Sequence, residues 1–169
     1  SLHNLKLWRE QGKEYTVAVN ISSHNLSDDE FPKKVKELLK KYKLPPSCLE
    51  LEVTESEIMK NPILAIKALE EIADIPLIIS IDDFGTGYSN FERLLEYKPD
   101  IIKIDGSLIK NIQTNRHNRS IVEMIVTFAK KQHIQTIAEF VESEEIFHIV
   151  QALGIDYSQG YAFGKPELF

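Results

Sequence analysis

Cysteine is nearly absent from this sequence, which contains one, Cys48, among 169 residues. A single cysteine excludes an internal disulfide and any zinc site built from several thiolates. Long apolar runs are also missing, and the existing ones are far shorter than the ~20 residues that a transmembrane helix needs. Neither GxGxxG nor GxxxxGK[ST] occurs, so the sequence carries no Rossmann or P-loop phosphate signature. We therefore expect a globular chain that makes no membrane contact.

Positive charge is in deficit, because 20 Lys and Arg face 26 Asp and Glu, for a net charge of −6. This balance argues against binding to polymeric nucleic acid, whose phosphates attract basic surfaces. It is compatible with a small phosphorylated ligand held through metal ions. The five histidines show no paired spacing of the kind that binds zinc, so any metal site must use other ligands.

Short β-rich runs alternate with helical runs along the whole chain. This alternation predicts an α/β fold with a parallel sheet, either a (β/α) barrel or an open doubly wound sheet. About six strands are expected, fewer than the eight of a closed barrel. The predicted strands are 17–21, 49–54, 77–84, 101–105, 136–141 and 155–163.

Several helix boundaries can be predicted from local signals. Ser27 and Glu30 have the spacing of a capping box ahead of a helical apolar pattern. Asn61 precedes a proline at the favoured first helical position. Ser143 is expected to cap a late helix, which Gly154 ends.

Polar side chains recur near the carboxyl ends of the predicted strands. Within these strands, residue parity places them opposite the apolar positions, so one face carries ionisable groups. Buried charges must be paired or bind a metal, and catalytic groups of parallel barrels gather at this end. The residues are Asn20, Glu52, Asp82 with Asp83, Lys103 with Asp105, Glu139 with Glu142, and Gln159.

The donor types indicate which metal such a site would hold. Carboxylates and an amide are hard oxygen ligands that match Mg²⁺ or Mn²⁺. The adjacent acids Asp82 and Asp83 could bridge two ions, as in two-metal phosphoryl transfer, and Lys103 could stabilise a phosphate oxygen. The alternative is that an acid at a strand end only caps the next helix, as Asp83 or Glu142 could.

Six motifs occur in order along nearly the whole chain. They are VNIS (19–22), LEVTE (51–55), DDFGTGYS (82–89), KID (103–105), AEFVE (138–142) and QGYAFGKP (159–166). Together they resemble the EAL-domain family of bacterial cyclic-di-GMP phosphodiesterases. The resemblance implies a TIM-like barrel that hydrolyses cyclic di-GMP to linear pGpG with two Mg²⁺ or Mn²⁺ ions.

The resemblance also implies roles for the residues in these motifs. Asn20, Glu52 and Asp82 would bind one metal ion, and Asp83 would help to hold the second, with Asp105 and Glu139 nearby.

The catalytic groups implied by the resemblance are Glu139 and Lys103. Glu139 would be the general base, and Lys103 would contact the attacking water or the phosphate. Two further residues would complete the wall of the site, Glu142 and Gln159.

In this family the DFGTGYS loop couples dimerisation to metal binding. Glu55 would anchor that loop, and Gly85 and Gly87 would give it freedom to move. The resemblance therefore predicts a homodimer or higher oligomer, a cytoplasmic location, and further signalling domains in the parent protein.

Two features depart from the family pattern. The Glu-Ala-Leu strand is absent, so we expect residues 1–169 to be a single EAL-type domain truncated at its N-terminus, an incomplete barrel with poor or no activity. Phe140 replaces the glycine that is commonest in AEGVE, and strand parity predicts that it points away from the face of Glu139.

Two other functions fit parts of the pattern. One is a non-catalytic cyclic-di-GMP receptor or regulatory module. The other is a different Mg²⁺-dependent barrel enzyme, such as an enolase-type lyase with Lys103 as its base, which does not explain the ordered motifs.

Overall fold

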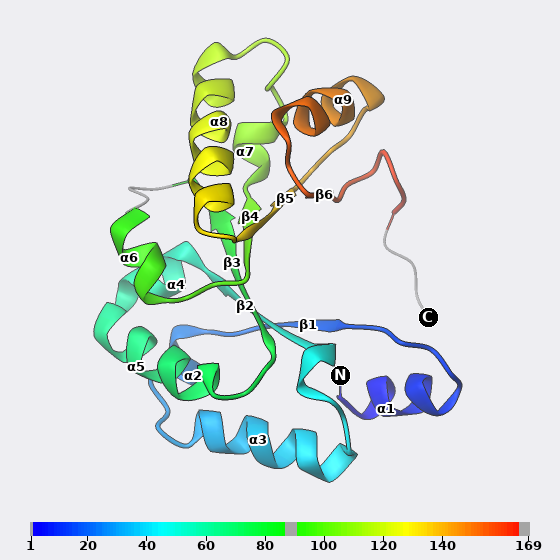
Figure 1. Cartoon of the computed structure of the whole chain (residues 1–169), viewed down its shortest axis with the longest axis vertical. Helices are drawn as coiled ribbons and strands as arrows, with labels where there is room; N and C mark the ends of the chain where they lie inside the picture. Colours follow the sequence, from blue (N-terminus) through cyan, green and yellow to red (C-terminus); the bar gives the residue numbers. More distant parts are fainter. Residues whose placement is uncertain (1, 87–90, 166–169) are drawn as a thin grey trace. The chain divides into compact units, whose positions relative to one another are not determined.

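The residues that the structure describes form a six-stranded sheet whose strands alternate with helices, which agrees with the α/β, TIM-like class predicted from the sequence. This computed structural model describes residues 2–86 and 91–165 (Figure 1). Strand order follows the chain from β1 to β6. The chain divides into two compact units, one of residues 1–80 and 90–99 and the other of residues 81–89 and 100–169.

The first unit is built around the parallel pair β1 (Val17–Asn20) and β2 (Leu49–Thr54). Every second residue of β2 is buried, which confirms the alternation expected for this strand. Strand β3 (Ile78–Phe84) leaves this unit and enters the second. The helices are α1 (Leu2–Glu10), α2 (Ser23–Leu26), α3 (Phe31–Tyr42), α4 (Glu55–Lys60), α5 (Pro62–Ala73) and α6 (Phe91–Glu96), with a 3-10 turn at Pro46–Cys48.

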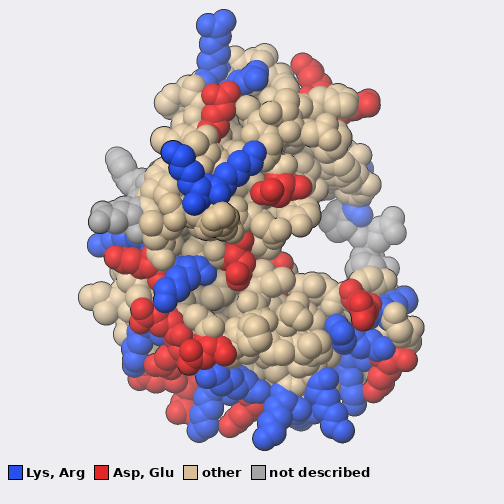
Figure 2. Space-filling model, viewed as in Figure 1, with Lys and Arg blue, Asp and Glu red and all other residues tan. Residues whose placement is uncertain are grey.

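Helices of the first unit bury one face and expose the other. In α5 the buried residues are Ala65, Ala68, Leu69 and Ile72, at the spacing of one helical stripe. In α3 most of the remaining surface is lysine, and Figure 2 shows basic side chains gathered where this helix lies in Figure 1.

The second unit contains three parallel strands in sequence order, β4 (Ile101–Ile104), β5 (Gln135–Ala138) and β6 (Tyr157–Ser158). All four residues of β4 are buried, as expected for a strand covered on both faces. The helices are α7 (Gly106–Ile109), α8 (Arg116–Lys131) and α9 (Glu144–Leu153).

Three predicted helix boundaries are confirmed. The Asn61 side chain accepts a hydrogen bond from Leu64 N at the start of α5. The Ser143 side chain caps α9, and Gly154 ends it in the left-handed conformation, with φ 79°. Each of these capping residues acts within one turn of its helix, so the local sequence is enough to predict the boundary.

The predicted capping box at Ser27 and Glu30 is wrong. Glu30 precedes α3 in a helical conformation and makes no side-chain cap, while Ser27 follows α2 and donates from its hydroxyl to Ser23 O. A capping box does occur five residues earlier, where Ser22 and Asn25 cap each other's backbone N–H at α2. One-turn helices such as α2 lack an apolar period, and the sequence pattern therefore misses them.

No helix within residues 2–86 and 91–165 combines the length and the apolar character that crossing a bilayer requires.

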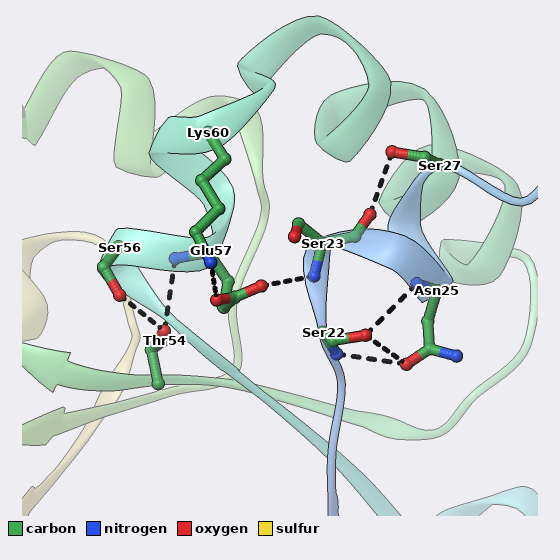
Figure 3. Close-up of polar contacts among 8 residues, drawn as sticks. All are labelled: Ser22, Ser23, Asn25, Ser27, Thr54, Ser56, Glu57 and Lys60. Atoms are coloured by element: carbon green, nitrogen blue, oxygen red, sulfur yellow. Dashed lines mark hydrogen bonds and ion pairs between the residues drawn. The ribbon is translucent and has the colours of Figure 1, made fainter.

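A polar network joins the segments that follow β1 and β2 in the first unit (Figure 3). Glu57 accepts a hydrogen bond from Ser23 N at 2.5 Å and also pairs with Lys60. Thr54 caps α4 by accepting from Glu57 N at 3.2 Å. The Lys60 ammonium and the Ser23 N–H lower the pKa of Glu57 to about 2.

We expect Glu57→Gln to destabilise the chain at neutral pH and to have little effect near pH 2. The folded-state pKa of Glu57 lies below its ordinary value of 4.5, so its stabilising contribution is present above that value and is lost as the pH falls toward about 2. The urea unfolding midpoints of the unsubstituted chain and of Glu57→Gln should converge as the pH falls from 4.5 to about 2. Glu37→Gln on α3 is the matched control, and an equal effect of both substitutions would contradict the assignment.

Candidate functional site

A buried lysine lies between two carboxylates in the second unit. Lys103 Nζ is 3.1 Å from Asp82 Oδ1 and 3.1 Å from Glu139 Oε1. The Lys103 and Glu139 side chains are each 8% exposed, and that of Asp82 is 15% exposed. Gln159 Nε2 donates to the same Glu139 Oε1 at 2.5 Å. These four side chains form one hydrogen-bonded and ion-paired cluster.

Strands hold each of these side chains in place. Asp82 lies on β3 and Lys103 on β4. Glu139 directly follows β5, and its backbone N–H donates to Ile104 O at 3.2 Å, so it continues the ladder with β4. Gln159 directly follows β6, and its N–H donates to Ala138 O at 2.9 Å. The expectation that strand ends bring these polar residues together holds for this group.

The two carboxylates of the cluster and the neighbouring Asp83 could ligate a cation together. Asp82, Asp83 and Glu139 each offer an oxygen, and these oxygens all lie within 4.8 Å of one another. Asp83 has φ 54°, a conformation that aspartate tolerates better than most residues, and its N–H donates to Asp82 Oδ1 at 3.0 Å. The donor set is all oxygen and suits a hard divalent cation.

Burial shapes the protonation of two of these acids. Desolvation raises the pKa of Glu139 although Lys103 opposes the shift. Burial, together with the charges of Asp82 and Asp105, also raises the pKa of Asp83. Desolvation is the larger cause of both shifts, and the charges of neighbouring acids act in the same direction.

The first unit holds two of the other predicted metal ligands, Asn20 and Glu52. The parallel register pairs Asn20 with Glu52 at the ends of β1 and β2. Ile21 N donates to Glu52 O at 2.7 Å, so the pairing extends past the end of β1. Glu55 is the first residue of α4. Asn20 and Glu52 are therefore register partners on neighbouring strands of this unit.

Asp105 caps a helix, as the alternative hypothesis proposed for strand-end acids. Its carboxylate accepts from Ser107 N at 2.8 Å at the start of α7. Within the described ranges, it is not in the group of carboxylates close enough to share one cation. Its charge nevertheless acts on Asp83.

A cavity of about 610 Å³ opens beside the cluster within the second unit. Glu139, Glu142 and Gln159 line it. Its other lining residues are Phe140, Gly160, Tyr161, Gly164 and Lys165. Neither Tyr161 nor Lys165 stands at a strand end, so the strand-end pattern does not predict them as site residues.

Phe140 corrects a prediction made from strand parity. It lines the same cavity as Glu139 rather than pointing away. The alternation of β5 ends at Ala138, and Phe140 has φ 53°, so the period of two no longer applies there. This left-handed conformation suits glycine, the commonest residue at the corresponding position of the AEGVE motif.

Gly85 follows β3 with φ 101°, and a Cβ there would lie 2.5 Å from Leu108 Cδ1. We expect Gly85→Ala to lower the free energy of unfolding by about 1–3 kcal/mol, because strain and a clash add. Gly12→Ala is the control, since Gly12 has φ 78° but open space around it. Chemical denaturation should rank Gly85→Ala as the more destabilising, and the reverse order would contradict this. Gly87 lies outside the described residues.

Comparison with known families gives one match that spans nearly the whole chain. The family model described as "EAL domain" matches residues 1–166. The cyclic di-GMP phosphodiesterase PdeF of Escherichia coli K12 is 42% identical over 153 residues, which are 90% of this chain and 20% of PdeF. The chain thus spans about a fifth of the length of the curated relatives it matches.

Solved structures agree with this match. The PaMucR phosphodiesterase in complex with c-di-GMP superposes with a TM-score of 0.90 and 32% identity, covering 98% of this chain and 67% of that one. Klebsiella pneumoniae BlrP1, solved as a calcium and cyclic-di-GMP complex, gives a TM-score of 0.88 and 28% identity, covering 98% of this chain and 42% of that one.

Proposed function

Because the chain belongs to the EAL-domain family, we propose that it is a cyclic-di-GMP phosphodiesterase. Water would attack one phosphorus atom of the cyclic dinucleotide, a new P–O bond would form, and one ribose 3′ oxygen would leave. The product is linear pGpG. The names of the relatives and the bound ligands of the similar structures support this substrate.

The observation that carries the proposal is the contact of Lys103 with both Asp82 and Glu139 inside a buried cluster. A lysine and acids in a mostly desolvated site can order water and stabilise charge that develops on a phosphate. A purely structural ion pair needs one acid, whereas this site has three carboxylates within 4.8 Å.

We propose that Asp82 and Asp83 hold divalent cations, Mg²⁺ or Mn²⁺, with two ions in a complete site and the Glu139 carboxylate beside them. Asn20, Glu52 and Asp105 are proposed to contribute further oxygen ligands. Ions bound there supply positive charge that stabilises phosphoryl oxygens and lowers the pKa of water.

The protein's own side chains have separate proposed tasks. Glu139 accepts the proton of the attacking water, which its raised pKa favours. Gln159 fixes the orientation of Glu139 through its 2.5 Å hydrogen bond. Lys103 donates to the attacked phosphate or to the attacking water. Glu142 and Glu55 are proposed to support the wall of the site and the loop after β3.

The test is to incubate the chain with cyclic di-GMP and Mg²⁺ or Mn²⁺ and to follow pGpG by chromatography. The proposal expects pGpG in the presence of either metal and none with excess EDTA. Binding of cyclic di-GMP without any pGpG would instead identify a receptor. Release of GMP as the first product would contradict cleavage of a single bond.

We further propose a homodimer in the cytoplasm, which the family resemblance supports. Light scattering coupled to size-exclusion chromatography should give the mass of two chains. A single-chain mass at every concentration tested would contradict the dimer.

A further inference from the structure

Phe140 is an exposed aromatic residue held in an unusual conformation beside the proposed catalytic acid. Its φ is 53° and its side chain lines the cavity that Glu139 also lines. The residue is 48% exposed. Bulky side chains rarely adopt this backbone conformation, and such outliers concentrate at functional sites.

Helix α7 fixes the position of the Phe140 ring. Lys110 Nζ lies 4.4 Å from the ring centroid. A Cβ on Gly106 would lie 2.3 Å from Phe140 Cδ2, so only glycine lets the ring approach this closely. Gly106 and Lys110 are four residues apart and therefore share one side of the helical turn. The ring thus rests on α7 by one face.

The other face of the ring is available to a ligand. Half of the residue is exposed, and the cavity of about 610 Å³ lies within the size range of small-molecule sites. The ammonium group of Lys110 draws π-electron density toward α7, which favours an electron-rich ring on the opposite face. Purine bases have such rings and stack on aromatic side chains.

We propose that Phe140 is a stacking platform for a purine base of the substrate. This inference rests on the proposed function, because it places a base of cyclic di-GMP next to Glu139. Phe140 would contribute to substrate affinity and base preference, and it would take no part in proton transfer.

The experiment measures binding of GMP and of ribose 5-phosphate to the chain by calorimetry in Mg²⁺ buffer. The two ligands share sugar and phosphate, and only GMP has a base. Phe140→Ala should weaken GMP binding about 5- to 150-fold, the range typical of one lost base stack. Binding of ribose 5-phosphate should not change, and Phe140→Tyr should keep the affinity for GMP.

Phe163→Ala is the matched control. Phe163 is 56% exposed and packs against Phe147 with ring centroids 5.3 Å apart, and it does not line the cavity. It should leave both affinities unchanged. Equal loss of GMP and ribose 5-phosphate binding in Phe140→Ala, or no loss of either, would overturn the proposal, as would an unmeasurable affinity of the unsubstituted chain for GMP.

This result can be separated from the proposed function. If the chain hydrolyses cyclic di-GMP and Phe140→Ala leaves its KM unchanged, the stacking role alone is wrong. If the chain releases no pGpG but Phe140→Ala still weakens the binding of GMP and not that of ribose 5-phosphate, the hydrolytic function alone is wrong.

Discussion

Glu139→Gln is expected to reduce the turnover of cyclic di-GMP about 10²- to 10⁴-fold, the range for loss of one general base. The substitution keeps the shape of the side chain and an oxygen that can accept from Gln159, so the loss would reflect the missing charge and not altered packing. Single-turnover formation of pGpG measures the effect, with thermal unfolding as a check of the fold.

Glu144→Gln is the control for this substitution. Glu144 begins α9, its side chain is 88% exposed, and it pairs only weakly with His148, 3.8 Å away. The Glu144→Gln protein should turn over cyclic di-GMP at the same rate as the unsubstituted chain. A Glu139→Gln protein that retains more than about a tenth of the activity would exclude Glu139 as the general base.

Lys103→Met is expected to lower the free energy of unfolding in EDTA by about 3–5 kcal/mol, the range for removing one partner of a buried ion pair. Asp82 and Glu139 would then lie close together, mostly buried, without the cation that separates them. Added Mg²⁺ should recover part of the loss, because it supplies positive charge to the same carboxylates. Phosphodiesterase activity should stay low with or without recovered stability.

Urea denaturation with and without Mg²⁺ measures both effects of Lys103→Met. Lys131→Met, an exposed lysine in the last turn of α8, is the control and should change stability by less than about 0.5 kcal/mol. Equal destabilisation of the two variants in EDTA would show that Lys103 makes no specific contribution to the cluster.

Much of the fold follows from local sequence signals. The proline after Asn61 and the pair Ser143 and Gly154 give helix ends that the structure reproduces, because each acts through its nearest backbone groups. Strand β2 follows its alternating pattern throughout. The last strand is much shorter than the predicted range 155–163, because only Tyr157 and Ser158 pair with β5.

The cluster around Lys103 was predictable because its members stand on or next to strands. A period of two on parallel strands fixes both the face and the end at which a side chain lies, so Asp82, Lys103 and Glu139 could be placed together before the structure. The helix cap made by Asp105 could not be distinguished from a metal ligand, since the same residue type serves both roles.

The parts of the site that escaped prediction depend on non-periodic backbone. Phe140 turns into the cavity because its φ is positive, which no pattern in the sequence shows. Tyr161 and Lys165 line the same cavity from the segment after β6. Their positions result from tertiary packing, which the sequence pattern does not encode.

Manganese binding tests the central claim most directly, namely that Asp82 and Asp83 form a cation site beside Glu139. The free Mn²⁺ signal in electron paramagnetic resonance would be titrated with the chain and with the double variant Asp82→Asn/Asp83→Asn. We expect the unsubstituted chain to lower the free Mn²⁺ signal in proportion to the amount of chain added, because bound Mn²⁺ no longer contributes to it. The double variant should leave the free signal unchanged, and Glu144→Gln should behave as the unsubstituted chain. Equal loss of free Mn²⁺ with the chain and the double variant would contradict the central claim.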